Sequence, residues 1–321
     1  MAGVALVAVI LLWGLGPPVT KLVTAPALVA VTIRLWASVP ILVALVYATG
    51  GRISWNLLRR TWLAGALFGI NLVMVFAALQ HATVAVLSVI SALQPAVVVA
   101  LGPLFGDRPS RWHLSWTVVG ILGAAIVVLG AGHRVHTSTL GVLFCLGSML
   151  TFTAYFLIVR HVRSTQPISA FEWMAGAIFF SAVTVTIPAA LLTRSSDWAQ
   201  FGGTDWLYLG FVMLFVGIAG HVIMSWVTRF VQASRSSLYL LTMNVVAVLV
   251  AWPIHHESVT AWQAIGGLVV LASVAAVISR PPAPTVAAST TPVEPAADPG
   301  TERAAALPVL DRLPTAAPEL R

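Results

Sequence analysis

The sequence predicts an all-α integral membrane protein whose ten transmembrane helices form two inverted five-helix repeats. The first observation is composition: 59% of the 321 residues are hydrophobic and only 8% are charged, whereas a soluble domain carries about 25% charged residues. The second is that the apolar runs recur at the length that crosses a bilayer as a helix. The third is that features of the first half recur in the second. Since lipid offers no partner to backbone amides, each apolar run should be helical.

Ten apolar runs define the expected spans, and short polar or glycine-rich segments such as Gly50-Gly51 separate them. The spans are residues 4–22, 26–49, 62–80, 84–106, 113–131, 139–159, 168–192, 206–228, 236–254 and 259–279. We group residues 1–138 as the first five-helix repeat and residues 139–280 as the second, inverted one. Residues 281–321 are rich in proline and alanine. They are too poor in large apolar side chains to build a core, which predicts a disordered cytoplasmic tail.

Lysine and arginine near the ends of the spans predict the orientation, because cytoplasmic loops carry the excess of both. With a cytoplasmic N-terminus, the inner segments hold ten of them: Arg52, Arg59, Arg60, Arg108, Arg111, Arg160, Arg163, Arg229, Arg235 and Arg280. The outer loops hold only Lys21, Arg134 and Arg194. Both termini are therefore expected in the cytoplasm, with the chain in the plasma membrane. The net charge of +7 forms no stripe on a soluble face, so nucleic acid is not an expected partner.

Equivalent spans of the two halves carry equivalent residues. In the first and sixth spans an aromatic residue precedes a cation by eight positions, Trp13 before Lys21 and Phe152 before Arg160. The fourth and ninth spans each hold a polar break and then a terminal acid: Gln94-Pro95 with Asp107, and Asn244 with Glu257. A repeat of five spans places the second copy upside down. Many secondary transporters have this plan, with a solute site at the midplane between the copies.

Over about residues 4–279 the chain resembles the EamA-type family of the drug/metabolite transporter superfamily. The resemblance rests on Trp13-Gly14 with Lys21, on Arg34, on the stretch Ala82–Asp107 with Pro95, and on Ala233–Glu257. The chain departs from the family pattern at Asn244, where proline is usual, and at Asp107, where glutamate is usual. The resemblance implies ten helices and alternating access around a cavity lined by the first, third, fourth, sixth, eighth and ninth spans. It also implies movement of small metabolites, often amino acids and often outward.

Polar and amphipathic side chains inside the apolar spans are the candidates for the wall of that cavity, because such groups are costly in lipid. The candidates are Trp13, Asn71, Gln94, Tyr155, His221 and Asn244. For the three amides the alternative is hydrogen bonding between helices, which contributes only about 1 kcal/mol each. The residues alone favour neither interpretation of the amides.

Three titratable residues inside the spans have two interpretations each. His221 either carries a coupled proton, since its ordinary pKa lies near neutrality, or packs as a neutral ring. Glu172 either couples transport to protons or pairs at the inner interface with Arg160 or Arg163. Arg34 either extends its long stem to the outer headgroups or contacts a substrate carboxylate.

Four residues are expected to shape the helices rather than to bind solute. Gly14 and Pro95 are expected at helix breaks, and Asp107 and Glu257 are expected to cap the helices that follow them, where an acid complements the helix dipole by about 0.3–1 kcal/mol. No histidine or cysteine spacing matches a metal motif. Cys145 is the single cysteine, so the sequence predicts no disulfide, metal site or cofactor.

These observations favour a secondary transporter that exports small neutral or zwitterionic metabolites such as amino acids by alternating access. No carboxylate lies at the expected midplane to attract a cationic drug. The chain lacks a Gly-x-x-x-x-Gly-Lys loop, so ATP is not the expected direct driving force. The expected partners are a small-molecule solute and the lipid bilayer. The alternatives are a flippase for lipids or lipid-linked compounds, a channel and, less favoured, an intramembrane enzyme.

Overall fold

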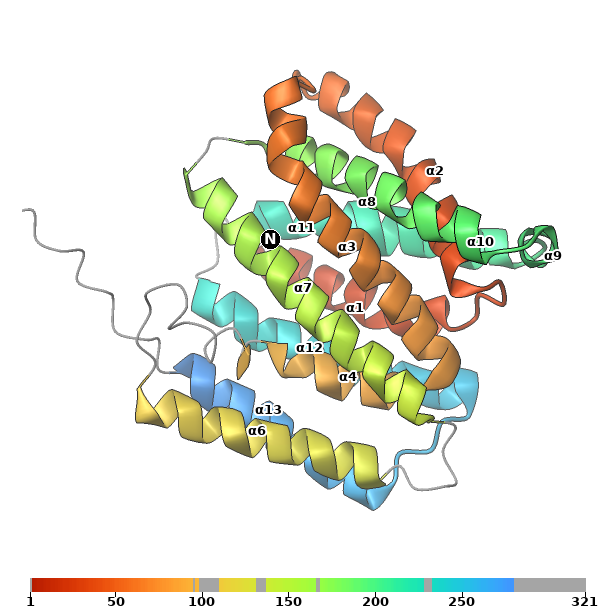
Figure 1. The fold of residues 1–321 in the computed structure, drawn as a ribbon. Helices are drawn as coiled ribbons and strands as arrows, with labels where there is room; N and C mark the ends of the chain where they lie inside the picture. Colours follow the sequence, from red (N-terminus) through yellow and green to blue (C-terminus); the bar gives the residue numbers. More distant parts are fainter. Residues whose placement is uncertain are drawn as a thin grey trace, which may run out of the picture. The chain divides into compact units, whose positions relative to one another are not determined.

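The computed structural model describes residues 2–94, 96–97, 110–130, 137–165, 168–227 and 233–279, and all regular elements within these ranges are helices (Figure 1). They are α1 (Ala2–Thr20), α2 (Ala27–Ala48), α3 (Trp55–His81), α4 (Val84–Ala92), α6 (Arg111–Gly130), α7 (Thr139–Thr165), α8 (Ala170–Leu192), the short α9 (Ser195–Ala199), α10 (Asp205–Phe211), the π-helix η2 (Val212–Ala219), α11 (Gly220–Val227), α12 (Ala233–His255) and α13 (Ala261–Ser279).

Five of the expected spans are helices long and apolar enough to cross a membrane: Ala27–Ala48, Trp55–His81, Thr139–Val159, Ala170–Leu192 and Asp205–Ile223. Four more coincide with shorter apolar helices, Val4–Thr20, Arg111–Val127, Met243–His255 and Ala261–Val277. The remaining span, expected at residues 84–106, is described as helix over Val84–Ala92 and at residues 94, 96 and 97. The protein is thus a multi-pass membrane protein.

Two of the expected helix boundaries were wrong. The third span was expected to begin at residue 62, but α3 begins at Trp55 because the Ser54 hydroxyl accepts a hydrogen bond from the Leu57 amide at 3.2 Å. This is the N-cap geometry that starts a helix. The sixth span was expected to end at residue 159, whereas α7 continues to Thr165. Both extensions add polar residues, which hydropathy alone assigns to loops.

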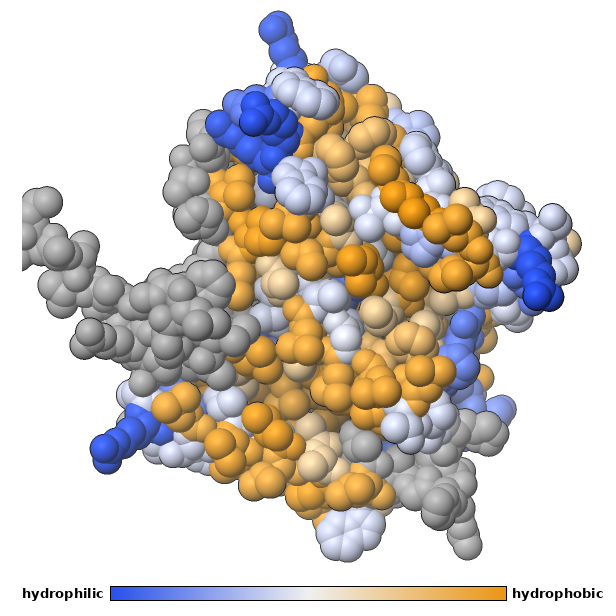
Figure 2. All heavy atoms as spheres, in the orientation of Figure 1, coloured by the Kyte–Doolittle hydropathy of each residue, from blue (hydrophilic) through white to orange (hydrophobic). Residues whose placement is uncertain are grey.

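Apolar side chains cover much of the outside of the helices. Figure 2 shows them across the middle of the visible face, with strongly hydrophilic side chains gathered toward its edges. Several large side chains are mostly exposed, including Leu129 at 80%, Leu191 at 78% and Leu207 at 70%. Soluble monomers rarely expose apolar patches of this extent. The surface is the one that lipid tails solvate.

Hydrogen bonds between connections show which helix ends lie together. The Thr24 amide donates to Asp205 Oδ1 at 2.9 Å and so joins the α1–α2 connection to the start of α10. The Ser138 amide donates to the His81 carbonyl at 2.9 Å and joins the start of α7 to the end of α3. In contrast, the Arg52 amide donates to Glu172 Oε1 at 3.0 Å and joins the α2–α3 and α7–α8 connections. We number the nine connections between the ten expected spans along the chain. In the described part of the chain these bonds join the first connection to the seventh, the third to the fifth, and the second to the sixth, so odd-numbered connections meet odd-numbered ones and even-numbered connections meet even-numbered ones.

Helices from the two halves of the chain pack in equivalent pairs. α6 packs on α13, α2 on α8 and α4 on α12, and each pair joins one expected span to the span five further on. Two further contacts correspond when each span is exchanged for its equivalent in the other half. The contact of α1 with α12 (first and ninth spans) corresponds to that of α7 with α4 (sixth and fourth spans). The contact of α3 with α7 (third and sixth spans) corresponds to that of η2 and α11 with α1 (eighth and first spans). These pairings are those that a twofold relation between the halves would give, and they are consistent with the two-repeat architecture.

Glycines allow the closest approach in one of these pairs. A Cβ added to Gly266 of α13 would lie 2.6 Å from the Gly123 carbonyl of α6, and a Cβ on Gly123 would lie 3.0 Å from the Gly266 carbonyl. The Ser273 hydroxyl donates to the Trp116 carbonyl at 2.9 Å in the same interface. Small residues that bring backbones together are the usual basis of helix association in membranes. Figure 1 shows α6 and α13 side by side.

Candidate solute cavity

A cavity of about 30 Å³ lies between helices of both halves of the chain. Its lining residues come from α2 (Arg34, Leu35, Ser38, Leu42), α3 (Phe68, Leu72), α8 (Met174, Ile178), η2 (Met213, Gly217, Ile218) and α11 (His221). Of the six spans that the family resemblance implied around the solute, the third (α3) and the eighth (η2 and α11) line this cavity, together with the second (α2) and the seventh (α8), which were not expected there. This volume holds about one or two water molecules, whereas small-molecule sites measure about 300–1,000 Å³. In the described conformation this cavity is therefore too small for a solute of amino-acid size.

The wall formed by η2 and α11 brings two of the predicted residues together. Trp13 Nε1 donates to the Val216 carbonyl at 3.1 Å, and the centroids of the Trp13 and His221 rings lie 5.1 Å apart. His221 Nδ1 also lies 2.7 Å from the Gly217 carbonyl. Single π-helical turns are rare and are frequent at functional sites. The cavity thus has one wall that is not regular α-helix.

Gly220 provides the space for Trp13, because a Cβ added to Gly220 would overlap the indole Nε1. We expect Gly220→Ala to lower the free energy of unfolding by about 1–3 kcal/mol, the usual cost of overpacking. A double-mutant cycle in detergent-solubilised protein checks this through the thermal midpoint. In a Trp13→Leu background the alanine should cost much less, because the overlapping indole is gone. An equal cost in both backgrounds would mean that the indole is not the obstacle.

Arg34 lies in the wall of the same cavity. Its guanidinium carbon lies 5.9 Å from the centre of the Phe76 ring, and its Nη2 lies 3.5 Å from the place that a Cβ on Gly217 would take. Of the two interpretations of Arg34, this position supports contact with the interior over extension to the headgroups. The sequence signal was an arginine eight residues into an apolar span.

Asn71 and Tyr155 lie at interfaces between helices. The Asn71 amide donates to the Ser148 carbonyl of α7 at 2.8 Å in a buried position. This contact is a hydrogen bond between helices, the alternative to lining the cavity. The Tyr155 ring lies 4.9 Å from the ring of Phe68, and Phe68 in turn lines the cavity. Tyr155 therefore supports the cavity wall from behind, and Asn71 joins α3 to α7.

Five other predicted residues lie apart from the cavity wall or outside the description. Gln94 and Asn244 are both partly buried and are not among the cavity's lining residues. Pro95 and Asp107 lie outside the described residues. Gly14 was expected at a helix break, but α1 is continuous from Ala2 to Thr20. Instead, Gly14 lets α12 approach, since a Cβ there would lie 2.6 Å from Val246 Cγ1.

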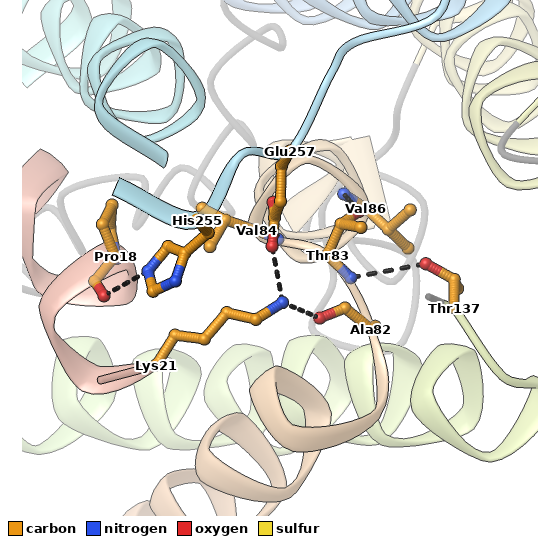
Figure 3. A network of polar contacts seen from close by, with 9 residues as sticks. All are labelled: Pro18, Lys21, Ala82, Thr83, Val84, Val86, Thr137, His255 and Glu257. Carbon is orange, nitrogen blue, oxygen red and sulfur yellow. Dashed lines mark hydrogen bonds and ion pairs between the residues drawn. The ribbon is translucent and has the colours of Figure 1, made fainter. Parts of the chain in front are cut away.

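An ion pair joins three parts of the chain at the end of the bundle where the odd-numbered connections meet (Figure 3). Lys21 Nζ lies 2.5 Å from Glu257 Oε1 and donates to the Ala82 carbonyl at 2.8 Å. Glu257 Oε2 accepts a hydrogen bond from the Val84 amide at 2.9 Å. The two side chains are 20% and 11% exposed. The Lys21–Glu257 ion pair thus ties the end of α1 to the start of α4 and to the α12–α13 connection.

The expectation that Glu257 caps the following helix was wrong, because Glu257 caps α4 instead. The start of α13 has its own capping box: the Gln263 amide donates to Thr260 Oγ1 at 3.2 Å, and the Thr260 amide donates to Gln263 Oε1 at 3.0 Å. This reciprocal pair satisfies two free amides. The Glu257 carboxylate is therefore available to the Val84 amide of another helix.

Glu172 lies at a surface end of the bundle and not in the cavity. It forms a capping box with Ser169 at the start of α8 and accepts the Arg52 amide at 3.0 Å. With Arg52 and Arg60 it lines a surface pocket of about 110 Å³. The side chains of its expected partners, Arg160 and Arg163, are outside the description. Capping of α8 is the role that its described contacts support.

Comparison with known proteins agrees with a helical membrane transporter. The EamA-like transporter family matches residues 1–129 and again residues 139–279. The chain therefore belongs to this family. It is 24% identical over 293 residues to the uncharacterized transporter YvbV of Bacillus subtilis (strain 168). The aligned residues cover 87% of this chain and 92% of YvbV. The fold is also similar to that of a protein of known crystal structure, with a TM-score of 0.56 and 22% sequence identity. The match covers 86% of this chain and 95% of the other chain.

Proposed function

We propose that this membrane transporter is a secondary transporter that moves small neutral or zwitterionic metabolites, such as amino acids, by alternating access. The observation that carries the proposal is the small cavity between helices of the two family-matched segments, with α2 and α3 on one side and α8, η2 and α11 on the other. A site between two repeats is the usual place for solute in such transporters. The cavity also combines a few polar groups with an apolar wall, as small-molecule sites do.

The proposed topology has ten spans in two inverted repeats, residues 1–138 and 139–280. The proposed location is the plasma membrane, with both termini in the cytoplasm. The separate grouping of odd-numbered and even-numbered connections supports consecutive helices that run in opposite directions. The excess of arginine in the even-numbered connections supports the cytoplasmic assignment of that end. The Lys21–Glu257 ion pair then lies at the outer end, and export is the proposed direction.

His221 is the better supported of the two coupling candidates. It lines the cavity and contacts Trp13, whereas Glu172 caps α8 at the surface. An imidazole is a side chain that can carry a proton, and this one lies in the cavity wall. We therefore propose His221 as the proton-coupling group.

The test is uptake and counterflow of labelled amino acids in proteoliposomes, with and without a pH gradient. Saturable flux is expected. A pH difference of one unit supports at most about tenfold accumulation for each proton moved. His221→Gln should abolish this accumulation and retain counterflow, and Glu172→Gln is the matched control that should retain both.

Three results would contradict the proposal. Flux that never saturates would indicate a channel. Movement of phospholipid without amino acids or other small metabolites would indicate a flippase. Accumulation that survives in His221→Gln would exclude this histidine as the coupling group, even if transport itself is confirmed.

A further inference from the structure

We propose that Arg34 is the recognition site for a carboxylate group, so that the solute is a small carboxylate with an apolar body. This inference rests on the proposed function, since it assigns the chemical class of the solute that the cavity admits. Amino acids and simple carboxylic acids share the recognised group. The experiment below separates them.

The first argument is charge. An arginine inside a membrane protein normally pairs with an acid, because an isolated charge is costly there. Among the residues that the structure describes, the one ion pair is that of Lys21 with Glu257. The other described carboxylates have partners elsewhere: Glu172 with the Arg52 amide, Asp197 with the Arg194 amide, and Asp205 with the Thr24 amide. Within this part of the chain, Arg34 has no carboxylate of the protein as its counter-ion.

The second argument is the way the guanidinium is held. The guanidinium carbon lies over the Phe76 ring, 5.9 Å from its centre, within the range of a cation–π contact. Arg34 Nη2 lies against Gly217, 3.5 Å from the place that a Cβ would take there, so glycine leaves room for the guanidinium. A guanidinium has parallel donors that match the two oxygens of a carboxylate. A lysine at this position would offer a point charge without that geometry.

The third argument is the rest of the wall. Besides Arg34, Ser38 and His221, the lining side chains are aliphatic, aromatic or methionine. No acidic side chain is among the lining residues to bind an ammonium group. The arrangement therefore provides for an anionic group at one end and an apolar body beside it. It offers nothing to a solute whose only charge is positive.

The fourth argument concerns space. At about 30 Å³ the cavity excludes a solute of amino-acid size in the described conformation. The wall opposite α2 includes η2, whose π-helical turns are less favourable than α-helix. Movement of that wall away from Arg34 would open the site. Solute binding and the change of conformation would then be coupled, as alternating access requires.

The experiment compares ligands that share one apolar body and differ in charge. Purified protein in detergent is titrated with leucine, leucinamide, 4-methylpentanoate and 3-methylbutylamine, and then with the acid and amide forms of alanine and phenylalanine. Binding is measured as a rise in the thermal midpoint, since a ligand of the folded state stabilises it. Acids should bind, and each matching amide or amine should bind at least about 30-fold more weakly, the effect of removing one partner of a desolvated charge pair.

Three variants test whether Arg34 causes the difference in binding between acids and amides. Arg34→Gln should remove the difference between acid and amide, and Arg34→Lys should retain part of it. Arg52→Gln removes an arginine outside the cavity and should leave the difference unchanged. The ligand comparison in the unaltered protein needs no variant, so a failure of Arg34→Gln to fold does not block the test.

Each outcome decides the assignment. Preference for leucine and 4-methylpentanoate alike supports a carboxylate site without amine recognition, and preference for leucine alone supports an amino-acid site. Equal binding of acids and amides, or no binding by any acid of the set, overturns it. Saturable flux in proteoliposomes without acid preference would sustain the proposed function and reject this site. Acid-selective binding without flux would support the Arg34 site and reject the proposed function.

Discussion

Replacing Glu257 with glutamine is expected to open the end of the bundle that the Lys21–Glu257 ion pair closes. The variant leaves the Lys21 ammonium, only 20% exposed, without an anion. Breaking a fully buried pair costs about 3–5 kcal/mol, and an exposed pair contributes about 0–1 kcal/mol. For this partly buried pair we expect about 1–3 kcal/mol, which shifts the balance of closed and open conformations by about 5- to 150-fold.

The measurement is the rate at which a membrane-impermeant maleimide labels a cysteine in the cavity. Cys145 is the only native cysteine, so Ser38→Cys in a Cys145→Ala background gives a single site. Glu257→Gln should raise the labelling rate from the outer side about fivefold or more. The charge-exchanged pair Lys21→Glu with Glu257→Lys restores the attraction but places a cation at the start of α4, where the dipole disfavours it.

We therefore expect an intermediate labelling rate for the charge-exchanged pair. A rate equal to that of the native pair would show that capping of α4 contributes nothing to closure. Unchanged labelling in Glu257→Gln would show that the ion pair does not hold the cavity closed.

Replacing Gly65 with leucine is expected to disrupt the packing of α3 on α8. A Cβ at Gly65 would lie 2.5 Å from the Ala177 carbonyl and 2.7 Å from Phe180 Cβ. The Ser181 hydroxyl also donates to the Gly65 carbonyl at 2.7 Å across this contact. Because the obstacle includes backbone, the two helices must separate, at a cost of about 3 kcal/mol or more. Thermal denaturation and the yield of monodisperse protein in detergent measure the effect.

Gly210→Leu is the matched control for this substitution. Gly210 is also helical, within α10, and has no atom within 4 Å of an added Cβ. Its variant should keep nearly the stability of the unaltered protein. Leucine favours helix more than glycine does, so similar losses in both variants would indicate that the loss does not arise from the α3–α8 contact.

Local signals in the sequence predicted the membrane class and the position of most helices. Length and hydropathy are properties of each segment alone, which is why α2, α8 and the segment Asp205–Ile223 lie where they were expected. The π-helical turns of η2 were not predicted, because no residue in Val212–Ala219 distinguishes π-helix from α-helix. Its geometry depends on contacts such as that of Trp13 with the Val216 carbonyl, which lie 203 residues apart in the chain.

Partners from distant segments also decided where the predicted site residues lie. Trp13 and His221 were selected as unusual residues in apolar spans, and the structure brings their rings together. Asn71 was selected by the same criterion, but a carbonyl of α7 is within its reach and binds it. Glu257 caps α4 because Thr260 and Gln263 already cap α13. Polarity in a span predicts that a partner exists, and only the fold decides which one.

The pairing of α6 with α13 has a consequence for the order of events during biosynthesis. Trp116 and Ser273, which bond across this interface, are 157 residues apart. At translation rates of about 5–20 residues per second, α6 waits roughly 8–30 s for its partner. Its glycine surface remains open to lipid, or to another protein that shields it, for that time. Because α13 leaves the ribosome long after α6, it completes a contact that α6 has lacked since its insertion.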